Sequence, residues 1–364
     1  MLLFARPIQL FLIGYLLFFS QCVTKNSTAG LTTDPVVAEK YADPLKLVSP
    51  FPIGTVMSLS TFGLPQALSI VKTEFSSVTC ENAMKIQATQ PTATTFNFTE
   101  SDSITNYCLR NGIRLHGHNL IWHQSLPAWL TAFQGDSAAW ENVLKSRITT
   151  MLTHFKGRVK SWDVVNEALS DDGLLRVGVT SSNSKASLWA QKLGKDYVAR
   201  CFQYAHAADP DARLFYNDYG QEYSPAKLNA ILAMVKDFQK RGIPIHGLGL
   251  QFHTNIQRSD TDLKNAIAQM ATSGLLIHIS ELDISMNGSQ SYSAPTPAML
   301  DIQKSRMNVI AAAYKALPAS QRFGITFWGI SDANSWITND WPLLFDKSYA
   351  KKPAYYGFWD GLKL

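Results

Sequence analysis

The sequence predicts an α/β fold, a single-domain (β/α)8 TIM barrel, and three observations lead to this prediction. Short apolar runs that fit strands alternate with segments of helical periodicity along most of the chain, a pattern typical of parallel sheets. Eight such runs are present, and eight parallel strands close a barrel of this kind. The length of 364 residues, 46% of them hydrophobic, suits one such barrel with a large core.

The expected strands are short apolar runs that finish on polar or glycine-bearing segments. They cover residues 52–59, 76–82, 113–119, 160–167, 213–218, 246–253, 275–281 and 323–329. Between them, apolar residues recur at spacings of three and four, as in residues 138–155, where Gly157 ends the stripe. In residues 224–242, Pro225 suits the first helical turn. These helices supply the crossovers that a parallel barrel needs.

The first 22 residues predict an export signal. Arg6 precedes the apolar run 8–19, which is short for a membrane span. Cys22 stands where a bacterial lipoprotein would carry its lipid, although Gln21 occupies a position that usually holds a small residue. Lipidation at Cys22 and plain cleavage further on both remain open, so the protein is expected to be secreted, periplasmic or anchored to a membrane. Residues 23–40 predict a flexible tether, and residues 41–364 the barrel.

Charge and cysteine usage exclude some classes of function. The net charge of +5 is spread along the chain without a Lys/Arg run, so no nucleic-acid partner is expected. Cys80, Cys108 and Cys201 match no metal-ligand spacing and are expected to be small buried residues. Whether two of them form a disulfide stays open at this point.

Six of the expected strands end on residues that can perform chemistry. These are Glu81 and Asn82, His118, Asn166 and Glu167, Asn217 and Asp218, Gln251 and His253, and Glu281. In a (β/α)8 barrel the carboxyl ends of all strands meet at one face, where active sites lie. One polar strand end would be a structural accident, but six at one face predict a functional site.

Glu167 and Glu281 are the expected pair of catalytic acids. They end the fourth and seventh strands, which face one another across the barrel mouth. Either glutamate alone would more simply be solvated or paired with a lysine. Two carboxylates on either side of one bond, however, are what glycoside hydrolysis requires.

Aromatic residues near the strand ends fit the same chemistry. Trp122, Trp328 and Trp336 fall at or just after strand ends, where an indole ring can lie on the apolar face of a sugar. Most of the nine tryptophans are nevertheless expected to pack in the core.

A metal site is the main chemical alternative. His116, His118 and His123 lie close together in the sequence, and His253 and His278 follow later. Metal-dependent barrel hydrolases use such histidine pairs, but they also need further ligands at the eighth strand. That strand ends in "TFWG" and carries none. We therefore expect no metal and no other cofactor.

Seven motifs in order make the chain resemble the glycoside hydrolase family 10 xylanases over about residues 51–358. The motifs are "ENAMK" (81–85), "GHNLIWH" (117–123), "WDVVNEA" (162–168), "LFYNDY" (214–219), "GLGLQFH" (247–253), "ISELDI" (279–284) and "ITFWGISDANSW" (325–336). The resemblance implies a (β/α)8 barrel that hydrolyses β-1,4-xylan inside the chain with retention of configuration.

The resemblance also implies a role for each matching residue. Glu167 would be the general acid/base and Glu281 the nucleophile, with His253 and Asp283 orienting Glu281 and with Gln251 beside it. Asn166 would bind the sugar 2-hydroxyl. The remaining substrate-binding residues would be Glu81, Asn82, Lys85, His118, Trp122, Asn217, Trp328 and Trp336.

Three departures from the family pattern bear on substrate preference. Gln124 and Ser125 stand in swapped order, Phe252 replaces a frequent serine, and Ala83 replaces an acid. Two alternatives therefore stay open beside xylan hydrolysis. One is a retaining hydrolase of another β-linked glycan, cellulose or mixed-linkage glucan. The other is a catalytically silent protein that binds xylan and xylo-oligosaccharides.

Overall fold

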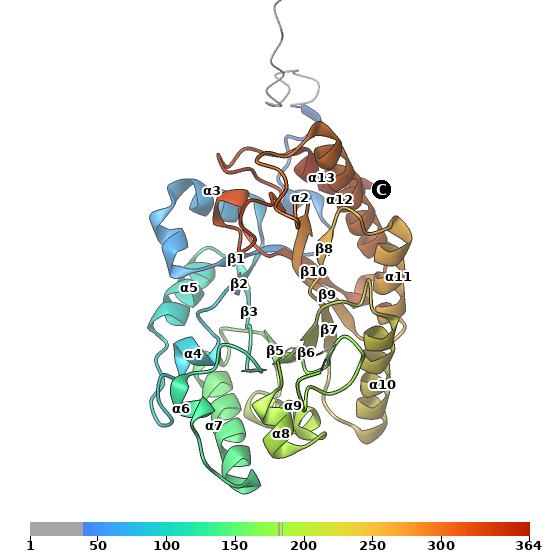
Figure 1. Cartoon of the computed structure of the whole chain (residues 1–364). Coiled ribbons are helices and arrows are strands. Elements are labelled where there is room, and N and C mark those ends of the chain that lie inside the picture. Colours follow the sequence, from blue (N-terminus) through green and yellow to red (C-terminus); the bar gives the residue numbers. More distant parts are fainter. Residues whose placement is uncertain (1–38, 181–182, 184) are drawn as a thin grey trace, which may run out of the picture.

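A ring of parallel strands surrounded by helices makes up the fold (Figure 1). The structure is a computed structural model that describes residues 39–180, 183 and 185–364. The predicted export signal, Cys22 included, lies outside the described residues, as does the predicted tether apart from Glu39 and Lys40.

Eight parallel strands form the barrel wall, and each lies within or close to an expected strand. They are β1 (Ile53–Met57), β2 (Ser77–Cys80), β3 (Arg114–His116), β5 (Ser161–Asn166), β6 (Arg213–Asp218), β7 (Gly247–Leu250), β9 (Leu276–Ser285) and β10 (Arg322–Phe327). Two short strands extend the wall at the mouth, β4 (Ile121–Trp122) beside β5 and β8 (His253–Asn255) beside β9. The pairing order is β3-β2-β1-β10-β9-β7-β6-β5-β4.

The ring closes between β3 and β5 at Gly117. Its backbone N–H donates to the carbonyl of Ser161 at 2.8 Å, and its carbonyl accepts from Asp163 at 2.9 Å. A Cβ at this position would lie 2.1 Å from Cε3 of Trp162. Only glycine therefore lets the two strands approach closely enough to complete the barrel.

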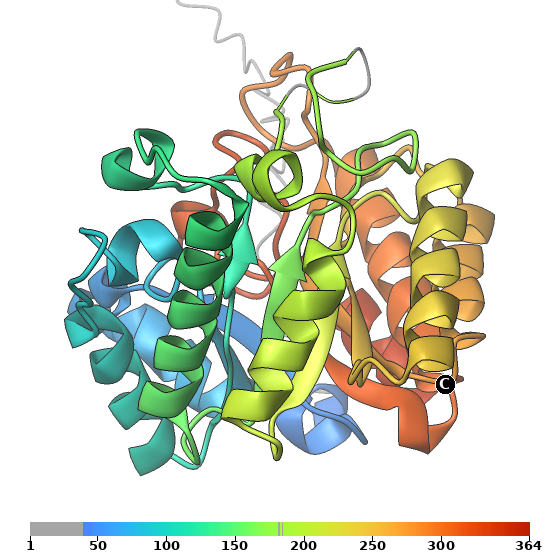
Figure 2. The ribbon, with the colours of Figure 1, turned by 90° about the horizontal axis from the view of Figure 1, so that it is seen from below.

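The helices cover the outside of the barrel (Figure 2). They are α2 (Leu45–Val48), α3 (Pro65–Glu74), α4 (Ile86–Thr89), α5 (Thr99–Arg110), α6 (Ala128–Thr131), α7 (Ser137–Phe155), α8 (Leu188–Leu193), α9 (Tyr197–Ala208), α10 (Pro225–Arg241), α11 (Asp260–Ala271), α12 (Pro297–Lys315) and α13 (Pro353–Lys363). Short 3-10 helices are η1 (Leu59–Gly63), η2 (Ala319–Gln321) and η3 (Asp332–Asn334). The caps match the sequence: Asp136 accepts from the N–H of Ala139 at the start of α7, and Gly242 ends α10 at φ 67°.

A buried arginine in α7 fixes two loops at the mouth. Arg147 is fully buried and donates to the backbone carbonyls of Met84, Asn119 and Leu120, and to Oγ1 of Thr89. A guanidinium presents five donors in a rigid fork, so it can hold several carbonyls at once. The loops after β2 and β3, which carry candidate site residues, are thereby attached to one helix.

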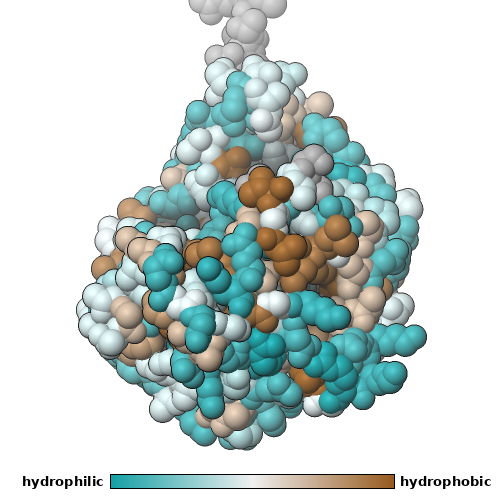
Figure 3. All heavy atoms as spheres, turned by 60° about the horizontal axis from the view of Figure 1, so that its bottom comes forward, coloured by the Kyte–Doolittle hydropathy of each residue, from teal (hydrophilic) through white to brown (hydrophobic). Residues whose placement is uncertain are grey.

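The surface is mixed, with apolar groups concentrated locally. Hydrophobic residues gather near the middle of the face drawn in Figure 3, among hydrophilic ones. The loop that follows β5 exposes Leu174, Val177 and Val179. Among the described residues, no helix combines the length and the apolar character that crossing a membrane requires. Three cysteines are buried free thiols and form no disulfide with one another: Cys80, Cys108 and Cys201.

Candidate active site

A pocket of about 620 Å³ opens at the carboxyl ends of the barrel strands, and it gathers most of the predicted site residues. Those that line it are Glu81, Asn82, Lys85, His118, Trp122, Asn166, Glu167, Gln251, His253, Glu281, Trp328 and Trp336. Asn217 and Asp283 do not line this pocket; they are fully buried behind it. The prediction that the polar strand ends meet at one face is therefore correct.

Glu167 lies directly after the last residue of β5 in a left-handed backbone conformation. Its φ of 55° is unfavourable for a residue with a side chain, so surrounding contacts must hold it. Its N–H donates to the carbonyl of Asn217 at 2.9 Å, and its carbonyl accepts from Nε of Arg176 at 3.0 Å. The chain turn at this point brings the carboxyl group into the pocket.

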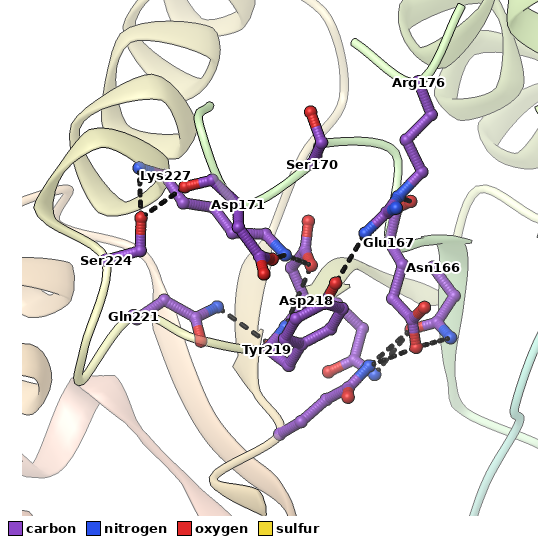
Figure 4. A network of polar contacts seen from close by, with 12 residues as sticks. Asn166, Glu167, Ser170, Asp171, Arg176, Asp218, Tyr219, Gln221, Ser224 and Lys227 are labelled. Atoms are coloured by element: carbon purple, nitrogen blue, oxygen red, sulfur yellow. Dashed lines mark hydrogen bonds and ion pairs between the residues drawn. The ribbon is translucent and has the colours of Figure 1, made fainter. Parts of the chain in front are cut away.

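Arg176 anchors the loop that follows β5 (Figure 4). Besides the carbonyl of Glu167, it binds Oδ1 of Asn183 and the hydroxyl of Tyr219, both at 2.7 Å. The residue is 3% exposed. One buried guanidinium thus connects the loops after β5 and β6 to the backbone of the candidate acid.

Two amide side chains contact the carboxyl group of Glu167. Nε2 of Gln251 lies 3.0 Å from its Oε1, and Nδ2 of Asn166 lies 3.3 Å from the same oxygen. The family resemblance predicts Gln251 beside Glu281, but only its backbone carbonyl contacts that residue, through the N–H of Glu281. The side chain of Gln251 contacts Glu167 and Asn166 through Nε2.

Glu281 lies within β9 and has two side-chain partners. Nδ2 of Asn217 donates to its Oε1 at 2.7 Å, and Nε2 of His253 lies 3.3 Å from its Oε2. The other ring nitrogen of His253 lies 2.8 Å from Oδ2 of Asp283, which also accepts from Nε1 of Trp336 at 2.8 Å. The expected arrangement of Asp283, His253 and Glu281 is therefore present as a hydrogen-bonded chain.

The environments of the two glutamates shift their pKa values in opposite directions. Burial raises the pKa of Glu167, and the nearby carboxylate of Asp218 raises it further. Burial acts in the same direction on Glu281, but the neighbouring His118 and the hydrogen bond from His253 outweigh it, so its pKa is lowered. Asp283 and Glu281 in turn raise the pKa of His253 against the effect of burial, which favours the cationic imidazole.

Polar and aromatic groups from β4 and from the loops after β2, β3 and β10 also line the pocket. Nζ of Lys85 lies 2.9 Å from Oδ1 of Asn82 and 5.0 Å from the ring centre of Trp122. His118 is fixed through Nδ1, 2.9 Å from Oδ2 of Asp163. Its ring centre lies 5.2 Å from that of Trp328. Donors and ring faces thus stand together, as recognition of a sugar requires.

The three departures from the family pattern lie differently with respect to the pocket. Phe252, at φ 60°, is fully buried in the hydrophobic core, and Ala83 is also buried; neither lines the pocket. Gln124 does line it, where its Oε1 accepts from Nζ of Lys185 at 2.5 Å. Of the three departures, only the Gln124–Ser125 exchange therefore places a side chain where it can contact the substrate.

Two of the histidines weighed as metal ligands lie within hydrogen-bond distance of hydroxyl groups on neighbouring strands. Nδ1 of His116 lies 2.8 Å from Oγ of Ser161, and Nε2 of His278 lies 2.9 Å from Oγ1 of Thr326. In the part of the chain that the structure describes, no group of three or more His, Cys, Asp or Glu residues is arranged to hold a metal ion.

Several residues that line the pocket received no substrate-binding role from the sequence. They are His123, Gln124, Arg176, Lys185, Tyr219 and Tyr223, in loops after the strands. Tyr219 directly follows Asp218 at the end of β6, a signal that could have found it. No local pattern distinguishes Arg176 or Lys185, since the path of their loop depends on contacts with other loops.

Comparison with known proteins gives consistent matches. The family model described as Glycosyl hydrolase family 10 matches residues 46–360. Three curated relatives are each 36% identical to this chain. Endo-beta-1,4-xylanase Xyn10C of Cellvibrio japonicus matches over 93% of this chain and 62% of its own length. Exoglucanase XynX of Acetivibrio thermocellus matches over 86% and 29%, and an endo-1,4-beta-xylanase of Geobacillus stearothermophilus over 84% and 94%.

The fold comparison agrees with the sequence comparison. Native xylanase10C from Cellvibrio japonicus superimposes with a TM-score of 0.81 and 34% sequence identity, covering 88% of this chain and 72% of that chain. The chain spans less than two thirds of the length of Xyn10C and of XynX.

Proposed function

Since the chain belongs to glycosyl hydrolase family 10, we propose that it is a retaining endo-1,4-β-xylanase. In this proposal Glu167 is the general acid/base and Glu281 the nucleophile of a double displacement. Glu281 attacks the anomeric carbon while Glu167 protonates the leaving oxygen. Glu167 then takes a proton from the water that hydrolyses the glycosyl-enzyme.

The single observation that carries this proposal is the opposite electrostatic environment of the two glutamates. Burial and Asp218 favour the protonated form of Glu167, which suits an acid. His118 and His253 favour the ionised form of Glu281, which suits a nucleophile. Two carboxyl groups whose pKa values are pushed apart divide the roles of acid and nucleophile. Retention requires these carboxyl groups to lie about 5–5.5 Å apart.

The other pocket residues are proposed to hold xylose units. Asn166 would bind the 2-hydroxyl, because it lies between the two glutamates, with its Oδ1 2.8 Å from Nδ2 of Asn217. Glu81, Asn82 and Lys85 would bind hydroxyls of the units on the non-reducing side of the cleaved bond. His118 and Trp122 would line the subsite at the bond itself, and Trp328 and Trp336 would cover the sugar rings. Asn217, Gln251, His253 and Asp283 would orient the two glutamates.

Release of reducing sugar from xylan tests the activity. We expect release by the wild-type protein and loss of release in the Glu281→Gln and Glu167→Gln variants. These substitutions keep the size of the side chain, so a thermal unfolding profile close to wild type controls for folding. Binding of xylo-oligosaccharides without release of reducing ends would favour the alternative of a silent binding protein.

A related hydrolase of another β-linked glycan is the second candidate, and the match to a protein named exoglucanase favours keeping it. Comparison of kcat/KM on xylan, carboxymethylcellulose and mixed-linkage glucan separates the two. We expect xylan to be the preferred substrate. Equal or faster hydrolysis of either glucan would reject the xylanase proposal in favour of a glucan hydrolase.

We further propose that residues 1–22 direct export, and that residues 23–40 link the signal or an anchor to the catalytic domain, residues 41–364. Cys22 offers a lipidation site, so the Cys22→Ser variant should move from the membrane fraction to the soluble fraction. A wild-type protein that is cleaved and soluble would support the export signal and would reject the proposal that Cys22 carries a lipid anchor.

A further inference from the structure

The face opposite the catalytic pocket carries the amino ends of the barrel strands, and the proposed chemistry does not use it. In Figure 2 the loops of the mouth lie at the top, and the outer helices run from there toward the opposite edge. The last turns of these helices and the loops that precede the strands form this face, which we call the basal face. Exposed basic residues on it include Lys72, Arg110, Lys156, Lys160, Lys240 and Lys363.

Positive charge predominates on the basal face. None of the basic side chains just named forms an ion pair within the described part of the chain. The acids in the same helix turns and loops are Glu74, Asp209, Asp211 and Asp360, and the first two of them are buried. An excess of unpaired surface cations attracts an anionic surface.

Leucine side chains are exposed among these cations. Leu47, Leu109 and Leu364 are 70%, 50% and 80% exposed, and each adjoins a lysine or arginine in the sequence. Cations at helix ends stabilise the helix macrodipole, which explains their presence there. The macrodipole does not explain the exposed leucines, whereas a lipid interface accepts basic and apolar side chains together.

The beginning of the described chain is fixed to the same side of the molecule. Nζ of Lys40 lies 2.9 Å from Oδ1 of Asp360, in the last turn of α13. Nε1 of Trp359 donates to the carbonyl of Asp43 at 3.1 Å. The chain therefore enters the barrel beside the end of α13 that belongs to the basal face.

The proposed anchor would bring this face close to a membrane. Residues 23–38 separate Cys22 from the described chain, and the ends of a flexible chain of that length lie about 20–25 Å apart on average. A lipid on Cys22 would thus hold the end of α13 near the lipid surface. Lysine and arginine side chains at that distance add to the attraction when the lipid is anionic.

We propose that the basal face lies on an anionic lipid surface, so that the catalytic pocket opens away from the membrane. The inference rests on the proposed export and lipidation, and it names the orientation of the anchored enzyme. The polysaccharide then reaches the pocket from the side that the membrane leaves open.

An environment-sensitive fluorophore on one introduced cysteine reports which face meets the lipid. Thr73→Cys places the label on the basal face, and Ser291→Cys places it in the exposed loop between β9 and α12, at the mouth. Both variants are full-length chains that also carry Cys22→Ser, so the surface is tested without the lipid anchor. The three cysteines of the barrel are buried, which leaves the introduced one for labelling.

The label at position 73 should shift to shorter wavelength on vesicles of phosphatidylcholine with phosphatidylglycerol, an anionic lipid. The shift should be lost on vesicles of phosphatidylcholine alone and in high salt, because salt screens the attraction. The label at position 291 should not respond on either kind of vesicle.

Charge reversal on two faces separates the basal face from net charge. Affinity for the anionic vesicles should fall by about tenfold or more in Lys72→Glu/Lys363→Glu, and by a smaller factor in Leu364→Ser. The matched control Lys195→Glu/Lys347→Glu changes the net charge equally at exposed positions on the mouth side, and it should stay within about threefold of the parent chain. Release of reducing sugar from soluble xylan should be the same in all of them.

Three outcomes would overturn the inference. A response at position 291 equal to or larger than that at position 73 would mean that the mouth meets the lipid. Equal losses in the two charge variants would assign the attraction to net charge, and binding to soluble polygalacturonate without binding to vesicles would assign the face to an acidic polysaccharide. Failure to hydrolyse xylan would instead reject the proposed function, and an unchanged fractionation of Cys22→Ser would reject the anchor. Neither of these two failures alters the vesicle result, so the failures are distinguishable.

Discussion

Nε2 of His253 lies 3.3 Å from Oε2 of Glu281, and the same imidazole is held by Asp283 on its other side. Glu167 has a different environment: it forms no ion pair within the described part of the chain, and amide groups contact its carboxyl oxygen. A cation beside one glutamate and amides beside the other give the two carboxyl groups different proton affinities.

Replacement of His253 should move the acidic limb of the pH profile. In the proposed mechanism the ionised form of Glu281 is the active one, and His253 helps to lower its pKa. In His253→Ala that contribution is lost, so the pKa of Glu281 should rise and the acidic limb of kcat/KM should shift upward by about one pH unit. His154→Ala, a partly exposed histidine paired with Asp102, is the matched control and should leave the limb unchanged.

Replacement of Asp218 should move the alkaline limb in the opposite sense. In the proposed mechanism the protonated form of Glu167 is the active one, and the carboxylate of Asp218 raises its pKa. Asp218→Asn should therefore lower that pKa and bring the alkaline limb of kcat/KM to lower pH.

The ion pair of Asp218 needs its own control. Nζ of Lys227 lies 2.8 Å from Oδ1 of Asp218, and both side chains are fully buried, so the single variant leaves the cation with the longer contact to Oδ1 of Asp171, at 3.6 Å. The double variant Asp218→Asn/Lys227→Met removes both charges and should show the same direction of shift. An alkaline limb that stays in place in both variants would argue against Asp218 as the cause.

Arg176 is predicted to position Glu167 rather than to bind substrate tightly. Arg176→Lys cannot reproduce the fork that joins the carbonyl of Glu167 to Asn183 and Tyr219. We expect kcat on xylan to fall by about tenfold or more. Glycosylation by aryl xylobiosides with good leaving groups should fall less, since that step needs little protonation.

The comparison of leaving groups separates positioning from general damage. Arg200→Lys alters an arginine that pairs with Glu141 between outer helices and should affect neither substrate. Equal losses on both substrate classes in Arg176→Lys would mean that the arginine supports the fold of the loop without directing the acid.

Glu222 should make the protein less stable as pH rises. The residue is 4% exposed, neither carboxyl oxygen has a hydrogen-bond partner among the described residues, and burial raises its pKa from 4.5 to about 7. The unfolded chain therefore loses this proton at lower pH than the folded one. The contribution of Glu222 to stability is fully present below about pH 4.5 and is lost progressively up to about pH 7.

Glu222→Gln removes this titration. The free energy of unfolding in urea, measured at pH 5 and pH 8, should show a pH-dependent loss that is about 2–3 kcal/mol smaller in the variant than in wild type. Glu39→Gln, at an exposed position, is the control and should behave like wild type. A variant with the same pH dependence as wild type would show that Glu222 is ionised at little cost.

The sequence was sufficient to predict the barrel because its local patterns of apolar, capping and glycine residues agree with the global fold. The eight apolar runs, the cap before α7 and Gly242 after α10 each specify their own element without distant contacts. The polar strand ends were sufficient to predict that Glu167 and Glu281 lie in one pocket, since a closed barrel brings every carboxyl end to one face.

The remainder of the site depends on contacts between loops. Nε2 of Gln251, after β7, contacts Glu167, after β5, and no property of the sequence motif predicts this contact. Arg176 reaches the backbone of Glu167 only because Tyr219 and Asn183 hold its other donors. Tertiary packing determines such placements, and the residues at the strand ends do not predict it.

The most direct test of the central claim, that Glu281 is the nucleophile and Glu167 the acid/base, is the configuration of the product formed by Glu167→Ala in azide. An aryl xylobioside with a good leaving group should still glycosylate Glu281, and azide should then attack in place of the water that Glu167 no longer activates. NMR of the product should identify the β-xylobiosyl azide. An α-azide, or an equal azide rescue in Glu281→Ala with the β-azide as product, would contradict the assignment.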